Sequence, residues 1–166
     1  MKISVKAMGA LMKISVKPMG APIESKQPRE VDMPLVEIDL LEGRAQAELD
    51  AISDAVHEAM VAVLDVPPRD RFQVITERSP GYLRFDPNYL DIDRDEGFLL
   101  IRITLAAGRT TDAKQAFYGR VAGLLAQRTG MRTDNLAVVL VETEREDWSF
   151  GRGQASYLEL PRDAWR

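Results

Sequence analysis

The chain contains no cysteine and only one histidine among its 166 residues. Without cysteine, a disulfide framework, a thiolate metal site and a thiol nucleophile are all excluded. Long apolar runs are missing as well, and a membrane-spanning helix needs about 20 such residues in succession. We therefore expect a cytoplasmic protein that has no membrane partner.

Sequence motifs for several common chemistries are also absent. The chain has no HxxxH pair, no GxSxG, no phosphate-binding loop and no GxGxxG. We interpret His57 as a structural histidine, because no metal-ligand or triad partner lies at suitable spacing. The acidic pairs Asp91/Asp93 and Asp95/Glu96 are interpreted as solvated loop charges. No metal site is expected.

Charge is divided unevenly along the chain. Residues 1–33 hold six Lys/Arg and three Asp/Glu, whereas residues 34–166 hold 16 and 23, within a total of −4. An acidic body argues against nucleic acid as the main partner.

The N-terminal part is a short tandem repeat. Residues 1–11 recur as residues 12–22 with two prolines substituted, and a polar linker follows. The copies are too short and too few for a solenoid, and their lysines interrupt the apolar core that a secretory signal needs. We predict an extension over residues 1–33 and a domain over residues 34–166. Either the repeat results from cloning or from a wrongly assigned start, with Met33 as the native first residue, or it serves as a short pairing or docking strand.

The domain begins with a strand pattern that leads into an amphipathic helix. Residues 34–41 alternate or run apolar, which favours a strand. Residues 45–64 carry apolar side chains at helical spacing, and Pro67 with Pro68 ends that helix. Residues 72–76 are predicted as a second strand.

The second half repeats this order. Residues 98–105 predict a strand, and a helix follows with Thr110 or Thr111 as its N-cap and Gly130 just beyond its end. Residues 136–141 predict a fourth strand that is apolar enough to be buried.

Two segments are predicted to be irregular. Residues 80–95 are rich in Pro, Gly, Asp and aromatic residues, which indicates a long loop with a short hairpin. Long loops of this kind often carry function. Residues 148–160 form a glycine-broken tail with some strand potential.

The predicted fold class is α/β (α+β), with two successive β-α-β units. A unit of this length favours parallel pairing of its two strands through a right-handed crossover. Two such units predict a four-stranded sheet with both helices on one face. The opposite face would be exposed and apolar, which is costly for a monomer, so we expect an oligomer.

Chemically useful groups lie at three predicted strand ends. Pro34 opens the first strand, Asp70 lies between Arg69 and Arg71 behind the double proline, and Arg109 precedes the second helix. Ligand sites gather at strand ends of α/β sheets, and a guanidinium at a helix N-terminus suits a carboxylate. Two of these groups also have a plainer interpretation: Arg109 as a surface arginine, and Asp70 as a turn or salt-bridge residue.

Pro34 gains a titratable group only when it is the first residue of the chain. Initiator methionine is readily removed before proline, so a chain started at Met33 would carry a free secondary amine at Pro34. Burial and nearby cations can lower the pKa of such an amine until it acts as a general base. Within a longer chain, the same nitrogen is an amide and cannot titrate.

Several segments together resemble one known family. They are Pro34-Leu35 with Asp39-Leu40, Glu42-Gly43-Arg44, Val66-Pro67, Arg69-Asp70-Arg71, Phe117-Tyr118, and the run from Asp147 through Trp148 and Phe150 to Gly153, which is the most specific. These residues resemble the tautomerase superfamily, in particular its branch around malonate semialdehyde decarboxylase. The resemblance covers roughly residues 34–158.

The resemblance implies a homotrimer of β-α-β units without a cofactor, in which the sheets form the inner wall. Pro34 matches the family's catalytic N-terminal proline, and Asp70 matches an aspartate of this branch. Arg109 matches the second arginine of an Arg-x-Arg pair, whereas Ala107 stands in place of the first. Trp148 and Phe150 resemble the apolar wall of the family's pocket.

We therefore predict a cofactor-independent tautomerase acting on a small 2-oxo or enol acid. Arg109 would hold the substrate carboxylate, Pro34 would shuttle a proton, and Asp70 would orient a water or the enol hydroxyl. Trp148 and Phe150 would bind the substrate and exclude solvent. One alternative is a lyase resembling malonate semialdehyde decarboxylase or a hydratase. Another is a non-catalytic trimeric protein, if the N-terminal extension is retained.

Overall fold

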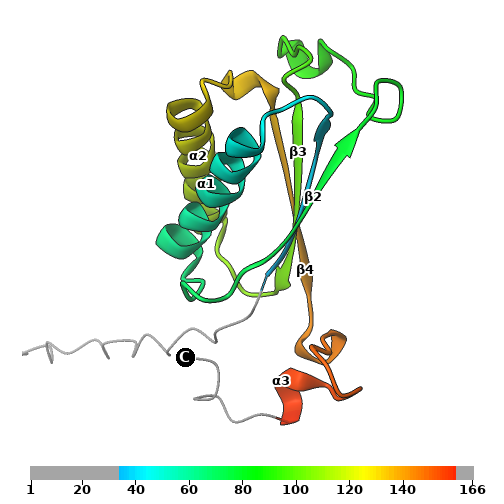
Figure 1. Cartoon of the computed structure of the whole chain (residues 1–166). Coiled ribbons are helices and arrows are strands. Elements are labelled where there is room, and N and C mark those ends of the chain that lie inside the picture. Colours follow the sequence, from blue (N-terminus) through cyan, green and yellow to red (C-terminus); the bar gives the residue numbers. More distant parts are fainter. Residues whose placement is uncertain (1–33, 160–166) are drawn as a thin grey trace, which may run out of the picture.

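The computed structural model describes residues 34–159, so the predicted extension over residues 1–33 lies outside the described residues. The elements are, in chain order, Leu35–Leu41 (β1), Gln46–Leu64 (α1), Phe72–Arg78 (β2), Leu99–Ala106 (β3), Thr111–Thr129 (α2), Leu136–Thr143 (β4) and Ser156–Glu159 (α3). Both predicted β-α-β units are present (Figure 1).

The four strands form one mixed sheet in the order β2-β1-β3-β4. Strands β1 and β2 are parallel, and so are β3 and β4, while β1 and β3 are antiparallel at the centre. Helices α1 and α2 lie side by side over one face of the sheet (Figure 1). The predicted topology, with both helices on one face, is confirmed.

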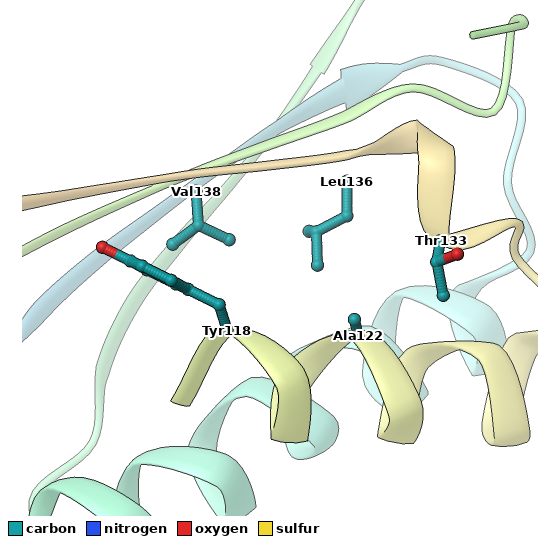
Figure 2. A pocket seen from close by; sticks show the side chains of 5 residues that line it. All are labelled: Tyr118, Ala122, Thr133, Leu136 and Val138. Atoms are coloured by element: carbon teal, nitrogen blue, oxygen red, sulfur yellow. The ribbon is translucent and has the colours of Figure 1, made fainter. Parts of the chain in front are cut away.

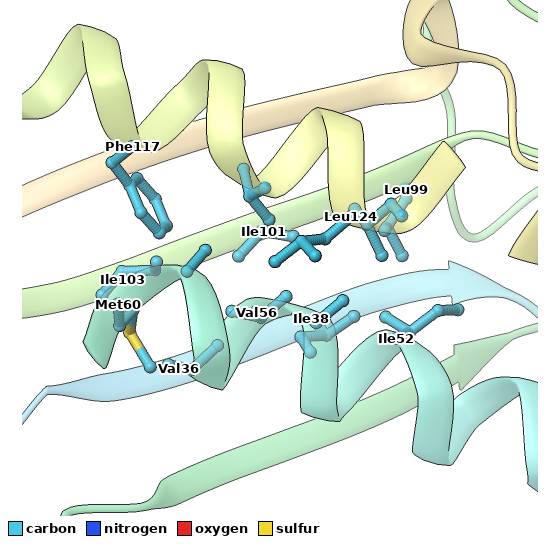
Figure 3. Close-up of a cluster of buried hydrophobic side chains, with 14 of the residues drawn as sticks. Val36, Ile38, Ile52, Val56, Met60, Leu99, Ile101, Ile103, Phe117 and Leu124 are labelled. Carbon is cyan, nitrogen blue, oxygen red and sulfur yellow. The ribbon is translucent and has the colours of Figure 1, made fainter. Parts of the chain in front are cut away.

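The core lies between the helix layer and the sheet (Figure 3). Alternate residues of β1 point into it, and Val36, Ile38 and Leu40 are at most 1% exposed. Strand β3 and the apolar stripes of both helices complete the cluster. Each such side chain contributes about 1.5–3 kcal/mol when it is fully buried, so the alternation of β1 and β3 determines which face the helices cover.

The predicted helix ends agree closely with the structure. Thr110 is the N-cap of α2, and its hydroxyl oxygen accepts the backbone N–H of Ala113 at 3.2 Å. Gly130 follows the helix with φ +70°, a left-handed conformation that suits glycine. Helix α1 ends at Leu64, and its C-cap Asp65 lies shortly before the double proline.

Strand β4 differs from the prediction, because it is not buried. It lies at the edge of the sheet, and Val139 is 47% exposed and Val141 38% exposed. An apolar run is typical of a buried strand but does not reveal the position of the strand in the sheet. The expectation of burial for residues 136–141 is therefore wrong for the single chain.

The two irregular segments also differ in detail. Residues 80–95 form the predicted long loop, but it contains a single β-bridge between Pro80 and Leu83 and a 3₁₀ turn instead of a hairpin. The tail after β4 ends in the short helix α3 instead of a strand. Arg132 holds the end of the long loop, because its guanidinium contacts the carboxylates of Asp93 and Asp95 at 3.0 Å.

We call the sheet face that α1 and α2 leave uncovered the open face. It carries exposed apolar side chains on both outer strands, including Phe72 at 47% and Val74 at 50% exposure. Its centre also holds charge, because Glu37 of β1 and Arg102 of β3 are paired in register there. The prediction of an exposed apolar face is thus confirmed for the outer strands, while the middle of the face is polar.

Neither long helix in the described part of the chain combines the length and apolar character needed to cross a membrane.

Candidate active site at one end of the sheet

The predicted site residues come together at one end of the sheet. Strands β1 and β2 begin at this end, and β3 and β4 finish there, as the parallel and antiparallel registers require. Pro34 precedes β1 and Asp70 precedes β2, while Arg109 follows β3 and the segment containing Trp148 follows β4. Figure 1 shows these four strand ends at the lower end of the sheet, with α3 beside them.

Pro34 and Arg109 are brought close by the pairing of β1 with β3. The register joins Leu35 to Thr104, so Pro34 comes beside the end of β3, where Ala106 lies. The guanidinium of Arg109 folds back and donates a hydrogen bond to the carbonyl oxygen of Ala106. A cation is therefore held at the strand end that borders the proline.

The backbone that carries Arg109 is fixed by Glu142 of β4. The carboxylate of Glu142 pairs with Lys114 Nζ at 3.0 Å and lies beside the backbone N–H groups of Gly108 and Arg109. The bond from Lys114, followed by these backbone donors, holds the pKa of Glu142 below its ordinary value. Residues 107–110, which we call the Arg109 loop, are thus tied to the end of β4.

Asp70 is a partly buried carboxyl group. Its backbone N–H donates to the Pro67 carbonyl oxygen at 2.9 Å, which closes a turn ahead of β2. Within the described residues, its Oδ2 is buried and has no hydrogen-bond partner. Burial raises the pKa of Asp70, and the nearby His57 opposes this shift. A carboxyl group in such a setting holds a proton more readily than a solvated one.

His57, which is interpreted from the sequence as a structural histidine, lies beside Asp70. Its Nε2 lies 3.0 Å from the carbonyl oxygen of Pro68, and its ring interacts electrostatically with Asp70. The contact arises because the chain turns back along α1 after Asp65, so a residue two turns before the helix end meets the following loop. The double proline predicted a turn at this point, but the sequence pattern did not show in which direction the chain turns.

An aromatic wall formed by Phe72, Trp148, Phe150 and Tyr157 borders the same end of the sheet. Trp148 and Phe150 stack with ring centres 5.4 Å apart and planes inclined by 16°. Phe150 also lies 5.7 Å from Phe72, which faces Leu35 across the β1–β2 register. Tyr157 meets Phe150 edge-on at 5.4 Å. The two predicted wall residues are therefore joined to the strand that follows Pro34.

Thr143, the last residue of β4, orients the tryptophan. Its hydroxyl oxygen accepts the indole N–H of Trp148 at 2.8 Å. The same hydroxyl donates to the carbonyl oxygen of Leu105 at 3.3 Å, and the Thr143 carbonyl accepts the backbone N–H of Ala107 at 3.0 Å. Neither Thr143 nor Glu142 was singled out from the sequence, because each is an ordinary polar residue at a strand end.

A separate hollow of about 270 Å³ lies between α2 and β4 (Figure 2). Its lining is mostly apolar and comprises Tyr118, Ala122, Thr133, Leu136 and Val138. It lies toward the start of β4, away from the strand ends that gather Pro34, Asp70 and Arg109. With no acid or cation in its lining, it is a poor candidate for proton-transfer chemistry.

Chemically, the end of the sheet at which Pro34 lies also offers a carboxyl group, a guanidinium and an apolar wall. In residues 34–159, no group of three or more His, Asp or Glu side chains is placed to hold a metal ion. The arrangement suits binding of a small carboxylic acid and proton transfer at a neighbouring atom. Proton transfer also needs a base. The Pro34 nitrogen cannot serve as one whenever residue 33 precedes it, because it is then an amide.

Comparison with known proteins agrees with this geometry. Two models described as tautomerase enzymes match the chain, over residues 34–90 and 70–151. The probable tautomerase YusQ of Bacillus subtilis (strain 168) is 35% identical over 127 residues, which are 76% of this chain and all of that protein. The chain belongs to the tautomerase family. The probable tautomerase YrdN of the same organism is 34% identical over 76% of this chain and 97% of its own length.

Solved structures of tautomerase-family enzymes share the fold. A malonate semialdehyde decarboxylase, described with decarboxylase and hydratase activities, is 35% identical with a TM-score of 0.70, covering 75% of this chain and 95% of that one. The FG41 malonate semialdehyde decarboxylase inhibited by 3-bromopropiolate is 34% identical, also with a TM-score of 0.70, over 76% and 99%. A fused 4-OT described as a symmetric trimer is 20% identical with a TM-score of 0.62, over 76% and 99%. This third likeness concerns the fold alone.

Proposed function

We propose that the domain starting at Pro34 is a cofactor-independent tautomerase that interconverts the keto and enol forms of a small 2-oxo acid. The observation that carries this proposal is the gathering of Pro34, Asp70, Arg109 and the aromatic wall at one end of the sheet. The match to the first tautomerase model begins at Pro34 itself, which supports this proline as the functional start of the domain.

Each group has a role that follows from its chemistry. The Arg109 guanidinium pairs with the substrate carboxylate, for which its planar set of donors is well shaped. The neutral amine of an N-terminal Pro34 takes a proton from the enol oxygen or from carbon and returns it at the other atom. Asp70 orients a water or the enol hydroxyl. Trp148 and Phe150 keep solvent away, which strengthens these polar contacts.

The proposed assembly is a homotrimer. Its support is the open face, which leaves Phe72 and Val74 about half exposed, together with the fold shared with a protein described as a symmetric trimer. Exposed apolar side chains gathered on one face of a sheet mark a protein interface more often than a solvated face.

The decisive experiment compares the chain that starts at Pro34 with the full chain of 166 residues. We expect the shorter chain to ketonise phenylenolpyruvate, followed by its ultraviolet absorbance, and the full chain to be inactive because its Pro34 is an amide. In the shorter chain, Pro34→Ala and Arg109→Ala should each lower kcat/KM by about 10²–10⁴-fold. Gln127→Ala, on the exposed side of α2, is the matched control and should leave activity unchanged.

Equal activity in the wild type and in both variants would contradict the assignment. Intact-mass measurement of the protein made from its native gene would show which chain the cell produces. A mass for the full sequence, without any species beginning at Pro34, would favour the non-catalytic trimeric alternative.

A lyase activity is the second candidate, and the 35% identity with a malonate semialdehyde decarboxylase favours it. In this reaction, a cationic Pro34 amine would polarise the carbonyl of a 3-oxo acid while carbon dioxide leaves. Ala107 provides no second guanidinium in the Arg109 loop, so the clamp on the carboxylate would differ from an Arg-x-Arg pair. Release of carbon dioxide from malonate semialdehyde distinguishes this candidate from tautomerisation.

A further inference from the structure

We propose that Glu142 and Thr143, the last two residues of β4, are positioning residues that set the two walls of the substrate site. Glu142 fixes the Arg109 loop, and Thr143 fixes the indole of Trp148. The inference deepens the proposed function and rests on it only for the kinetic readout.

The alternation of β4 explains why two neighbouring residues serve two different walls. Successive side chains of a strand point to opposite faces of the sheet. Glu142 is in register with the buried Leu105, which faces the helices, so its carboxylate reaches the N-terminal region of α2. Thr143 is in register with Ala106 and lies on the open face, where the segment after β4 carries Trp148.

Glu142 acts on the cationic wall through the backbone. Its carboxylate forms an ion pair at 3.0 Å with Lys114 in the first turn of α2, and it lies beside the backbone N–H groups of Gly108 and Arg109. Gly108 has φ +121°, a conformation that strongly favours glycine, so the loop turns sharply at the residue that Glu142 holds. The position of the Arg109 Cα is thereby linked to the end of β4.

Thr143 acts on the apolar wall through one hydroxyl group. That hydroxyl accepts the indole N–H of Trp148 and donates to the backbone of β3, so both its donor and its acceptor capacity are used. Trp148 is partly buried, and an N–H donor that loses its partner away from water is costly. The bond therefore selects the ring orientation that stacks on Phe150.

The two residues together link the walls across the end of the sheet. The Thr143 carbonyl accepts the N–H of Ala107, the first residue of the Arg109 loop, at 3.0 Å. A change in the end of β4 would thus alter the distance between the guanidinium and the aromatic wall. This distance determines how long a carboxylic acid with an apolar tail the site accepts.

The test of Thr143 compares Thr143→Val, which keeps the shape but loses the hydroxyl, with Thr143→Ser, which keeps it. In the ¹⁵N spectrum of the chain starting at Pro34, the Trp148 indole signal is assigned with Trp148→Phe, and Trp165 serves as the internal reference. We expect Thr143→Val to shift the Trp148 signal and speed its exchange with solvent, and Thr143→Ser to preserve both. KM for phenylenolpyruvate should rise about three- to tenfold in Thr143→Val, with a smaller change in kcat.

The test of Glu142 uses Glu142→Gln, with the exposed Glu146→Gln as its matched control. We expect Glu142→Gln to shift the backbone amide signals of Gly108 and Arg109 and to raise KM by a similar factor. The control should leave both the signals and KM unchanged.

An indole signal that is unaltered in Thr143→Val, or altered equally in Thr143→Ser, would overturn the role of Thr143. Unaltered amide signals in Glu142→Gln would overturn the role of Glu142. If the wild-type chain starting at Pro34 does not react with any enol acid, the proposed function fails, while the indole and amide signals still decide the positioning contacts.

Discussion

Two aspartates, Asp70 and Asp95, occupy surroundings that shift their pKa values in opposite directions. Burial raises the pKa of Asp70 from its ordinary value of 3.8, against the influence of His57. The Gly97 N–H and the Asn135 side chain lower the pKa of Asp95 from the same value. The first pattern is typical of a functional carboxyl group and the second of a structural one.

Asp70→Asn should therefore be more stable than the wild type at neutral pH although it loses activity. A raised folded-state pKa provides stability that is fully present below pH 3.8 and is lost as pH rises through the folded value. Because Asn cannot ionise, the advantage of the variant should grow from acidic to neutral pH. Thermal unfolding followed by circular dichroism across this range measures it.

Asp95→Asn is the matched comparison, and its trend should be the reverse. A lowered pKa provides stability above the ordinary carboxyl value that disappears as pH falls through the folded value. This variant should thus be less stable than the wild type at neutral pH, and the gap should close in acid. The same direction of change in both variants would contradict the assigned environments.

For single residues, the sequence was enough to predict site positions that have unusual chemistry. It was not enough to predict the contacts of ordinary polar residues. Pro34, Asp70, Arg109 and the Trp148 segment were predicted as site residues, and all four lie at the same end of the sheet, while their roles stay predictions. Contacts such as that of Thr143 with Trp148 depend on a folded tail. No local pattern specifies how such a tail returns to its strand.

Helix α2 illustrates an element whose boundary is determined by single residues. Replacing Thr110 by Ala removes the acceptor for the Ala113 N–H at 3.2 Å. We expect a loss of about 1 kcal/mol in the free energy of unfolding, measured by urea denaturation. Thr110→Ser keeps the acceptor and should recover most of the loss, whereas equal stability of the Ala variant would show that the cap contributes nothing.

The strands and helices were predictable because each has a characteristic spacing of apolar residues in the sequence. Strand β4 was found, but its burial was wrong, because local pattern does not reveal which strand lies at an edge. The hairpin expected in residues 80–95 is replaced by a loop held by Arg132 and Asn135, which lie about 40 residues further along the chain. Long-range contacts of this kind determine the conformation of segments that lack a regular spacing of apolar residues.

At the scale of the whole molecule, the open face is the surface on which we expect subunits to meet. Its exposed apolar side chains should be buried in the proposed trimer. Val139→Lys places a second cation beside Arg102, its register partner. We expect this variant to sediment as a folded monomer, because a 47% exposed side chain contributes little to the single chain. Gln127→Lys, on the exposed side of α2, should leave the assembly intact. An unchanged assembly in Val139→Lys would exclude this face as the interface.

The antiparallel pairing of β1 with β3 relates the two β-α-β halves by an approximate twofold rotation. The residues ahead of β1 and β2 therefore have counterparts ahead of β3 and β4, at the other end of the sheet. The counterpart of Pro34 is Phe98, which is 6% exposed and stacks on Phe85 at 4.3 Å. The counterpart of Asp70 is Asp134, which forms an ion pair with Arg132 at 3.2 Å. Pro34 is buried as well, so the two strand starts differ in their chemistry and not in their burial: only a proline that begins a chain supplies a secondary amine, and the proposed homotrimer would offer one reaction centre per subunit.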